Sequence, residues 1–393
     1  MALPLKYNVR NVFVRWRATI ATILGVALVV AVYILVQSLA IGLEKTNAST
    51  GDPRNVMIVR KGATAESSSL VTREQYRLIK YLPQVARDAR GQPLVSADLV
   101  IIINLIRREG NGEANVLLRG VSPRGMDLRP QVALVGGRWF VPGQREVVVS
   151  RRLAKRFANF EIGNRFKSGG KELTVAGWMD GGQTAFDSEV WMDADEARTL
   201  FTRENYSSVL ARTVDSTATQ SLMMRIESDK QLPLRADLET DYYAAQTRGG
   251  LLFKILGNLL ATMMSIGAVF AAMNTMYASV GARTREIGTL RVLGYRRRAI
   301  LASFIIEGAF LAALGGLLGC GAALLLQTVS RLLGWQFGTM GFETFAETLF
   351  NFRITPALAM QGFIFSVIVG VVGSLLPAVR AARLPMIAAL KAV

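Results

Sequence analysis

Four long apolar stretches constrain the fold of this chain more than any other feature. They cover residues 18–43, 251–282, 299–330 and 354–379. Each is long enough to cross the hydrocarbon core of a bilayer as a helix, which takes about 20 apolar residues. A long polar segment, residues 44–250, separates the first stretch from the second. We therefore expect an α-helical membrane protein with four transmembrane helices and a large extracytoplasmic domain between helices 1 and 2.

The distribution of positive charge predicts how these helices are oriented. The chain has a net charge of +17, and the segments 1–17, 283–298 and 380–393 together hold thirteen Lys and Arg residues against one acidic residue. Because Lys and Arg are retained on the cytoplasmic side of a membrane, both termini and the segment 283–298 are expected in the cytoplasm. Residues 44–250 and the short loop 331–353 are then periplasmic. Membrane topology explains the excess charge, so no nucleic-acid partner is expected.

The N-terminal segment 1–17 is expected to form an interfacial helix. Val9, Val12, Phe13 and Trp16 recur at helical spacing with arginines between them. A charged flank without regular structure is the alternative. The apolar stretch that follows resembles a signal peptide, but its length favours an uncleaved signal anchor.

The periplasmic segment 44–250 alternates strand-like and helical patterns, which predicts an α+β domain. A capping box at Thr72 and Gln75 marks one helix, and the turn at residues 168–171 marks a hairpin because glycine supplies the positive φ angles required. Glycine-containing turns at 142–143 and 181–182 are candidate boundaries between two subdomains. The expected strands are residues 55–59, 100–106, 146–149, 165–167, 172–176, 190–192 and 209–213, and the expected helices are 72–81, 151–157, 194–201 and 218–227.

Several classes of chemistry are excluded or disfavoured by composition. The chain has one cysteine, Cys320, and no histidine, which excludes a Cys/His zinc site and a His-based catalytic triad. The nearest approach to a phosphate-binding loop, Gly163 to Lys171, has the wrong spacing and is followed by Glu172 where Ser or Thr is needed. We expect no catalytic residues, no metal and no cofactor on this chain.

Polar and small residues within the apolar stretches are further candidates. Glu307 lies inside the third stretch, where a charge costs on the order of 2.5–3.5 kcal/mol unless it is paired or faces protein. It is either a coupling or relay residue or, as we favour, part of a helix–helix hydrogen bond. Gly315 and Gly319 form a small-residue motif that predicts close helix packing.

The basic segment between the second and third stretches has a helical pattern. Ile287, Leu290, Leu293 and Gly294 form a narrow apolar stripe beside an arginine-rich face. Such a helix would lie on the membrane surface and present its other side to a cytoplasmic partner.

Three stretches together resemble one family, the permease subunits of MacB-like and FtsX-like ABC transporters. These are residues 10–27, 283–308 and 376–384. The most specific is the second, in which Arg285-Glu286-Ile287-Gly288 is followed by Arg291 and Gly294 between two membrane spans. The resemblance, together with the four-helix topology, implies a mechanotransmission (type VII) transporter in a bacterial inner membrane.

The resemblance also implies a set of partners. Segment 283–298 would be a coupling helix that docks on a separate cytoplasmic ABC ATPase, which would hold the ATP and magnesium. Two permease copies, identical or related, would bind two ATPases, and a periplasmic adaptor and outer-membrane channel are further candidate partners. The substrate would be a lipid, lipoprotein, peptide or drug exported or extracted at the outer face. The implied coupling residues are Arg283, Arg285, Glu286, Ile287, Gly288, Leu290, Arg291 and Gly294, whereas residues 296–298 are assigned to lipid headgroups.

Three other functions remain open at this point. An FtsX-like signalling module would activate a periplasmic cell-wall hydrolase with the same fold. A membrane receptor without an ATPase would leave the pattern at residues 285–294 unexplained. An ion-coupled carrier would have to use Glu307 as its only intramembrane acid in these spans and would lack the expected inverted repeat.

Overall fold

The computed structural model describes residues 16–108, 112–246, 248–333, 337–340, 347–350 and 353–384. The chain divides into two units. The helical unit takes its described residues from Met1–Ile41, Leu251–Trp335 and Phe352–Val393, and the sheet unit from Gly42–Gly250 and Gln336–Asn351. Most of the expected interfacial helix 1–17 and of the tail 380–393 lies outside the described residues.

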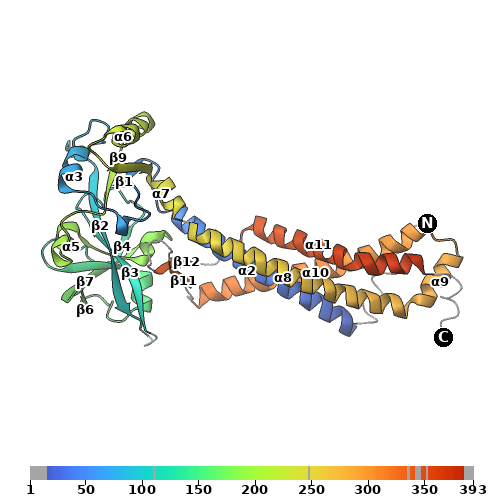
Figure 1. Cartoon of the computed structure of the whole chain (residues 1–393). Helices are drawn as coiled ribbons and strands as arrows, with labels where there is room; N and C mark the ends of the chain where they lie inside the picture. Colours follow the sequence, from blue (N-terminus) through green and yellow to red (C-terminus); the bar gives the residue numbers. More distant parts are fainter. Residues whose placement is uncertain are drawn as a thin grey trace. The chain divides into compact units, whose positions relative to one another are not determined.

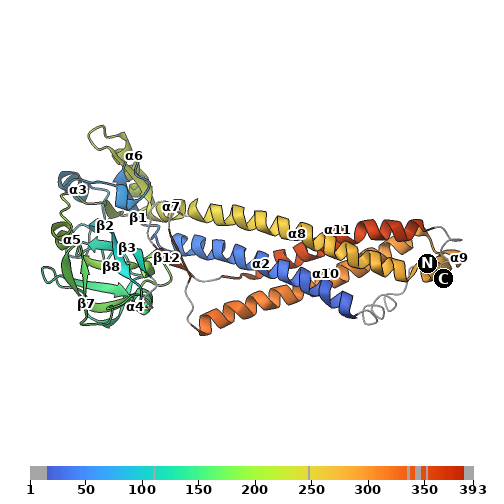
Figure 2. The same ribbon diagram turned by 60° about the horizontal axis from the view of Figure 1, so that its bottom comes forward.

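Within the described residues, four helices are long and apolar enough to cross a membrane. Figures 1 and 2 show them side by side. The last one begins where Thr355 accepts a hydrogen bond from the Leu358 N–H at 3.2 Å, with Pro356 in the first turn, as is favoured at helix starts. The expected four-helix membrane region is therefore confirmed. The helices are α2 (Trp16–Ala48), α8 (Arg248–Ala282), α10 (Arg297–Leu332) and α11 (Pro356–Arg383).

Small residues bring α10 and α11 into close contact. A Cβ added at Gly370 would lie 2.3 Å from the Cβ of Ala312, and one added at Gly308 would lie 2.5 Å from the Cβ of Ser374. Real Cβ atoms do not approach this closely, so the two backbones meet where side chains are absent. Without a hydrophobic driving force between helices in lipid, such contact is a main source of association.

The sheet unit contains one mixed ten-stranded sheet. Along the sheet the strands follow the order β10-β1-β9-β2-β3-β8-β5-β7-β4, and β6 pairs with β7. The pairs β3–β8 and β5–β7 are parallel and the other pairs are antiparallel. The expected α+β domain between helices 1 and 2 is confirmed. The strands are β1 (Asn55–Arg60), β2 (Val95–Ile106), β3 (Glu113–Val121), β4 (Ala133–Gly137), β5 (Glu146–Ser150), β6 (Arg165–Ser168), β7 (Lys171–Asp180), β8 (Glu189–Asp193), β9 (Ser208–Arg212) and β10 (Leu234–Leu238).

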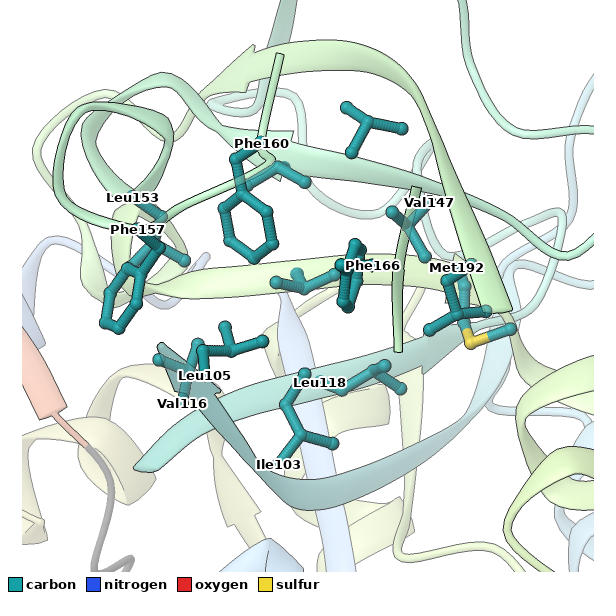
Figure 3. Packing of buried hydrophobic residues seen from close by; sticks show 14 of the residues in the cluster. Ile103, Leu105, Val116, Leu118, Val147, Leu153, Phe157, Phe160, Phe166 and Met192 are labelled. Atoms are coloured by element: carbon teal, nitrogen blue, oxygen red, sulfur yellow. The ribbon is translucent and has the colours of Figure 1, made fainter. Parts of the chain in front are cut away.

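Alternation along the strands divides the core into layers on the two faces of the sheet. On β1, Val56 and Ile58 join one cluster while Met57 and Val59 join another, because successive side chains point to opposite faces. One face carries two adjoining clusters, and the other face carries the third, which includes Tyr242. Figure 3 shows the cluster built on β2, β3, β5, β7 and β8.

Short helices cover these clusters. Helices α3 (Arg73–Lys80) and α6 (Ser216–Ser228) pack on the cluster at β1, β9 and β10, whereas α4 (Arg151–Arg156) and α5 (Ala194–Leu200) belong to the cluster of Figure 3. On the opposite face, α7 (Glu239–Ala245) contributes two tyrosines. On the face that carries two clusters, α3 covers one cluster and α5 covers the other. The helix layer therefore has a seam between α3 and α5.

Local signals in the sequence located several of these elements. Thr72 Oγ1 accepts from the Gln75 N–H at 3.1 Å, and Gln75 Oε1 accepts from the Thr72 N–H at 2.9 Å, which is the expected capping box. Gly169 and Gly170 have φ angles of 57° and 73° in the hairpin between β6 and β7. Strands β3, β4 and β10 and helix α7 were not anticipated. The glycine-containing turns at 142–143 and 181–182 connect elements of one continuous sheet.

The segment expected as a short periplasmic loop, residues 331–353, contains two strands. β11 (Phe337–Met340) and β12 (Glu347–Phe350) pair in antiparallel fashion. Both belong to the sheet unit.

Candidate functional site

The segment with the most specific sequence pattern folds as a short helix, α9 (Thr284–Val292), between α8 and α10. Its inner face is anchored by Ile287, which is only 3% exposed and packs with Val280 of α8, Phe304 of α10 and Ala378 of α11. Gly288 is also buried. The orientation of α9 is thus tied to three of the four long helices.

Helix α9 is shorter than the helix expected over residues 283–298. Gly294 has φ = +90°, its N–H donates to the Arg291 carbonyl at 3.2 Å, and the Tyr295 N–H donates to the Leu290 carbonyl at 3.1 Å. These two bonds form the Schellman motif that ends helices at a glycine. Gly294 therefore terminates α9, and Arg297 already belongs to α10.

The outer face of α9 and its C-terminal turn carry a mixture of charged and apolar side chains. Arg285 and Glu286 are exposed, and Leu290 and Arg291 are half-buried. Val292 is 59% exposed and Leu293 is 68% exposed. Leu293, at the C-cap of α9, thus lies outside the packed cluster that holds Ile287. Exposed apolar groups next to charged ones are typical of a recognition surface.

Arg283, at the N-cap of α9, is bonded inside the chain. Its Nη1 lies 2.9 Å from Glu307 Oε2 and its Nη2 lies 3.3 Å from Glu307 Oε1. The two side chains are 11% and 6% exposed. Arg283 had been expected to face a partner protein, but it neutralises the acid on α10, since a buried carboxylate needs such a partner. This contact is a helix–helix bond of the kind we favoured for Glu307.

Gly315 and Gly319 lie where the backbone of α10 meets α2. A Cβ at Gly315 would be 2.8 Å from the Ile23 carbonyl oxygen, and one at Gly319 would be 2.6 Å from the Ala27 carbonyl oxygen. Any larger side chain at these positions would separate α10 from α2.

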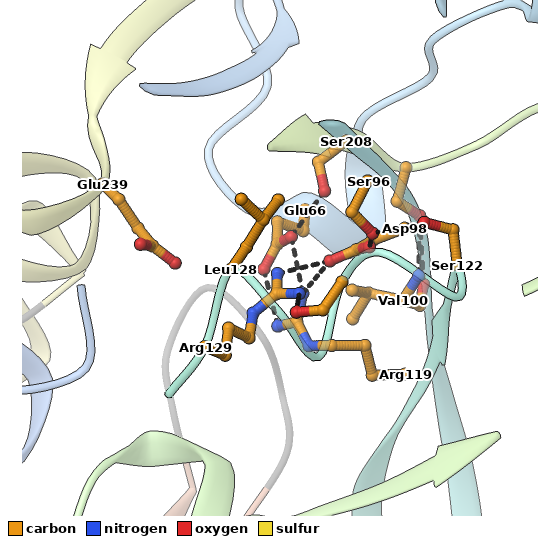
Figure 4. A network of polar contacts seen from close by, with 12 residues as sticks. Glu66, Ser96, Asp98, Val100, Arg119, Ser122, Leu128, Arg129, Ser208 and Glu239 are labelled. Atoms are coloured by element: carbon orange, nitrogen blue, oxygen red, sulfur yellow. Dashed lines mark hydrogen bonds and ion pairs between the residues drawn. The ribbon is translucent and has the colours of Figure 1, made fainter. Parts of the chain in front are cut away.

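The sheet unit contains a buried network of charges (Figure 4). Arg119 of β3 donates to both oxygens of Glu66 at 2.8–2.9 Å and to both oxygens of Glu189 at 2.8–2.9 Å. Arg129 bonds to Asp98 of β2, which also lies 3.4 Å from Arg119. All of these side chains are buried. Bidentate Arg–carboxylate pairs have strong directional preferences, so the network fixes β3 and β8 against residues that precede β2.

The network changes the ionisation of Glu66. Burial by itself would raise the pKa of this carboxyl, but the charge and hydrogen bonds of Arg119, with a hydrogen bond from Ser208, lower it below its usual range. Glu66 is therefore held in its ionised form, as a partner for Arg119 has to be.

A second buried acid, Glu239, joins the two chain segments that lead to the membrane helices. Its Oε2 accepts from the Asp52 N–H at 2.9 Å and from Asn55 Nδ2 at 2.8 Å. Asp52 lies four residues after α2, and Glu239 begins the short helix that precedes α8. A Cβ at Gly51 would lie 2.5 Å from the Thr240 nitrogen, so the two segments are in backbone contact. We call Gly51, Asp52, Asn55 and Glu239 the stalk contact.

Burial raises the pKa of Glu239, although Arg129 and the hydrogen bonds from Asp52 and Asn55 oppose this effect.

Among the described residues, no group of three or more His, Cys, Asp or Glu side chains could hold a metal ion. The stalk contact and the buried network were not found from the sequence because their members lie on separate strands and turns. The sequence gives one sign of the buried network, which is the single arginine, Arg119, within the apolar run 116–121.

Two family models match this chain. The MacB-like periplasmic core domain matches residues 19–229, and the FtsX-like permease C-terminal domain matches residues 258–386. The first covers more than half of the chain and includes the charge network. The second contains α9, Glu307 and both glycines of the α10–α2 contact.

Individual relatives agree with these models. An uncharacterized ABC transporter permease, YknZ of Bacillus subtilis, is 35% identical over 142 residues, which cover 35% of this chain and 31% of that protein. The macrolide export ATP-binding/permease protein MacB of Hahella chejuensis is 27% identical over 320 residues, which cover 77% of this chain and 47% of that protein. The matches thus span less than half the length of both relatives. The periplasmic region of MacB from Actinobacillus actinomycetemcomitans matches 49% of this chain with 14% identity and a TM-score of 0.38, and covers 92% of that chain.

One candidate membrane helix precedes the mixed α/β domain and three follow it, and the periplasmic and permease models match the chain in this order. Further relatives are likewise named as ABC transporter permeases or as MacB. This chain is therefore a membrane protein with an extracytoplasmic domain and belongs to the MacB-like, FtsX-like family of ABC transporter permeases.

Proposed function

We propose that this permease transmits ATP-driven motion from a separate cytoplasmic ATPase to its extracytoplasmic domain. The motion would drive export or extraction of a hydrophobic or envelope-bound molecule such as a lipid, lipoprotein, peptide or drug. ATP and magnesium would be bound by the ATPase. Two copies of the permease, or this chain and a related one, would act with two ATPases, and a periplasmic adaptor would complete the path.

The observation that carries this proposal is the construction of α9. Its inner face is anchored to α8, α10 and α11 through Ile287, while Arg285, Glu286, Val292 and Leu293 are exposed. A force applied to the exposed face would reach three membrane helices through one packed cluster. The basic residues of segment 283–298 support a cytoplasmic location for α9, and with it cytoplasmic termini.

Two groups of residues divide the work of coupling in this proposal. Arg285, Glu286 and Leu293 contact the ATPase, with Arg291 at the edge of the contact. Arg283, Ile287, Gly288 and Leu290 position α9, and Gly294 ends it. Arg283 acts through Glu307, so its charge stabilises the junction between α9 and α10 and is not offered to the partner.

The stalk contact supports the other end of the pathway. It binds the segment after α2 to the segment before α8. Movement of one of these helices along its axis would therefore be transmitted to β1 and to α7 together.

The proposal is tested by affinity purification of the tagged chain in mild detergent, with bound proteins identified by mass spectrometry. We expect an ABC ATPase to copurify with the wild type and to be lost from Leu293→Asp, which places a charge in the apolar part of the contact. The matched control is Val214→Asp, because Val214 is similarly exposed but lies in the sheet unit. Failure to recover an ATPase even with trapped nucleotide, or equal recovery with Leu293→Asp, would contradict the proposal.

A further inference from the structure

A cavity of about 430 Å³ opens in the helix layer of the sheet unit, at the seam between α3 and α5. Its floor is formed partly by Tyr76 and Tyr206, whose rings meet edge to face with centroids 5.6 Å apart. Tyr76 packs against the cluster under α3 and also against Ala194 at the start of α5. The volume is within the range of sites that hold small ligands. The cavity is remote in sequence from α9 and plays no part in the coupling argued above.

One wall of the cavity is strongly basic. Arg73, Arg77 and Lys80 stand on one side of α3, at spacings of four and three residues, and all three line the cavity. Like charges at these spacings repel one another. Within the part of the chain that the structure describes, none of the three forms a salt bridge with a carboxylate. The Nζ of Lys80 lies 5.8 Å from the ring centres of Tyr76 and Tyr81, so its neighbours are aromatic faces.

The opposite wall contains a buried arginine with unused donor capacity. The side chain of Arg198 is only 7% exposed, and its Nη1 donates to Asp195 Oδ1 at 2.8 Å. Its guanidinium lies over the ring of Tyr206, 5.0 Å from the centroid. The Nε of Arg198 is buried and has no hydrogen-bond partner among the described residues. Because this Nε is closed off from the cavity, Arg198 acts on the cavity through the charge of its guanidinium.

The acidic and phenolic groups complete the site. Asp195 is the one carboxylate among the residues that line the cavity, and it is already engaged by Arg198 and by the hydroxyl of Tyr206 at 3.1 Å. Burial, with smaller effects from Tyr206 and Asp195, raises the pKa of Tyr76 to about 12. Tyr76 therefore stays neutral, and its hydroxyl can donate a hydrogen bond. The lining as a whole is cationic and rich in donors.

We propose that this cavity binds a phosphate-bearing ligand of headgroup size on the extracytoplasmic side. Three cations without carboxylate partners match a phosphomonoester, which carries about −1.5 to −2 charges at neutral pH, better than they match a single carboxylate. Arginine binds phosphate through parallel hydrogen bonds, and the tyrosine faces provide a surface for the body of the ligand. A soluble sugar phosphate and the headgroup of phosphatidic acid are both phosphomonoesters and share this chemistry.

The test is isothermal titration of the full-length chain in an uncharged, phosphate-free maltoside detergent. Glucose 1-phosphate and dihexanoyl phosphatidic acid are the two probes, and glucose is the control ligand. We expect at least one phosphate probe to bind and glucose not to bind, and we expect binding to weaken as salt is added. Preference for glucose 1-phosphate would assign the site to soluble phosphates, and preference for the lipid would assign it to headgroups.

Variants establish whether binding occurs in the cavity. The double variant Arg77→Ala/Lys80→Ala changes only partly or fully exposed side chains, and we expect it to weaken binding by roughly ten-fold or more. Arg225→Ala is the matched control, because Arg225 is an exposed arginine on α6 over the same core cluster, and we expect less than about a two-fold change. Arg198→Lys should also weaken binding, since lysine lacks the planar guanidinium that binds phosphate through parallel hydrogen bonds. No binding of either phosphate probe, or equal binding by the double variant, would overturn the proposal without affecting the coupling function.

Discussion

At the scale of single residues, the pairing of Arg283 with Glu307 explains how an acid is accommodated inside a membrane helix. The two side chains are mostly buried and joined by two contacts of 2.9 and 3.3 Å. Each side chain alone would leave an uncompensated charge in a low-dielectric environment. The pair therefore stabilises the junction between α9 and α10 only while both members are present.

This leads to a prediction for a double-mutant cycle. Glu307→Leu and Arg283→Leu should each lower the free energy of unfolding by about 3–5 kcal/mol, because each leaves the other charge unpaired. The double variant should lose less than the sum of the two. The measurement is SDS-induced unfolding in mixed micelles, with the exposed Arg285→Leu as the control, expected to stay within about 0.5 kcal/mol of the wild type. Strict additivity would mean that the two side chains do not interact.

The buried carboxyl of Glu239 predicts a pH dependence of stability. Its pKa is raised, chiefly by burial, so the folded state holds its proton to higher pH than the unfolded state, in which the value is near 4.5. Between the unfolded-state pKa and the folded-state pKa, the folded chain binds more protons than the unfolded chain. The free energy of unfolding therefore falls as the pH rises through this range.

Glu239→Gln should remove this contribution. The amide oxygen can still accept from Asp52 and Asn55, so we expect a higher melting temperature than wild type near neutral pH and a smaller loss of stability between about pH 4.5 and neutrality. Glu113→Gln, at an exposed position on β3, serves as the control. A Glu239→Gln variant that melts below the wild type at neutral pH would show that the charge itself is required.

At the scale of elements, the long helices associate through complementary small residues. Gly308, Ala312 and Gly316 of α10 recur every four residues and face Ser366, Gly370 and Ser374 of α11. The closest approaches are below 3 Å for an added Cβ, whereas no atom lies within 4 Å of the Cβ position at Gly267 of α8. Glycines in these helices thus fall into two groups: those that a neighbouring helix approaches closely and those that have no neighbour at the Cβ position.

Alanine substitution should separate the two groups. Gly370→Ala would force apart α10 and α11, and we expect a loss of roughly 1–3 kcal/mol of stability from overpacking. Gly267→Ala should be neutral or stabilising by up to about 1 kcal/mol, since alanine favours the helix and meets no neighbour. Unfolding in mixed micelles compares the two variants directly. Equal effects would contradict the close contact at Gly370.

The sequence identified elements with a strong local signal and missed those defined by distant partners. The membrane helices follow from apolar length, and α3 follows from the capping box at Thr72. The helix expected over residues 283–298 is too long at its C-terminal end, because Gly294 adopts a positive φ that ends α9. The α10–α11 glycine seam was overlooked because only the spacing of Gly315 and Gly319 was considered.

In the candidate sites, too, the sequence shows local patterns but not contacts between distant residues. The residues of α9 could be proposed from one continuous pattern, but the partner of Arg283 could not, because Glu307 is 24 residues away and its direction depends on helix packing. The stalk contact joins residues 187 positions apart. The periodicity of the segment around Asp52, or of the segment around Glu239, does not predict that the two meet.

At the scale of the whole molecule, the proposed transmission of motion would give these local features a common role. An anchored helix with an exposed outer face meets the requirement for receiving force. A stalk contact between the segments that follow α2 and precede α8 meets the requirement for passing it to a folded domain. The buried charge network joins parts of that domain by several bidentate ion pairs, so in the proposed mechanism the domain would respond as one body.

The rigidity of the sheet unit can be tested at Arg119. Replacing this fully buried arginine by Met leaves Glu66 and Glu189 without their partner, and we expect a loss of about 3–5 kcal/mol in stability. Hydrogen exchange should quicken in β3 and β8 first. Arg124→Met, which removes a partly exposed arginine from the same unit, should change exchange much less. Unaltered protection in the Arg119 variant would contradict a structural role for the network.

The most direct test of coupling is hydrogen exchange of the permease bound to its copurified ATPase, with and without trapped ATP. The account predicts that nucleotide changes the protection of residues 50–60 and 234–246, which surround the stalk contact, in the wild type and in Val214→Asp. Leu293→Asp, incubated with the same concentration of ATPase isolated from the wild-type complex, should not show this change. Protection of the stalk that is indifferent to nucleotide in the wild-type complex would contradict the claim that α9 transmits motion to the extracytoplasmic domain.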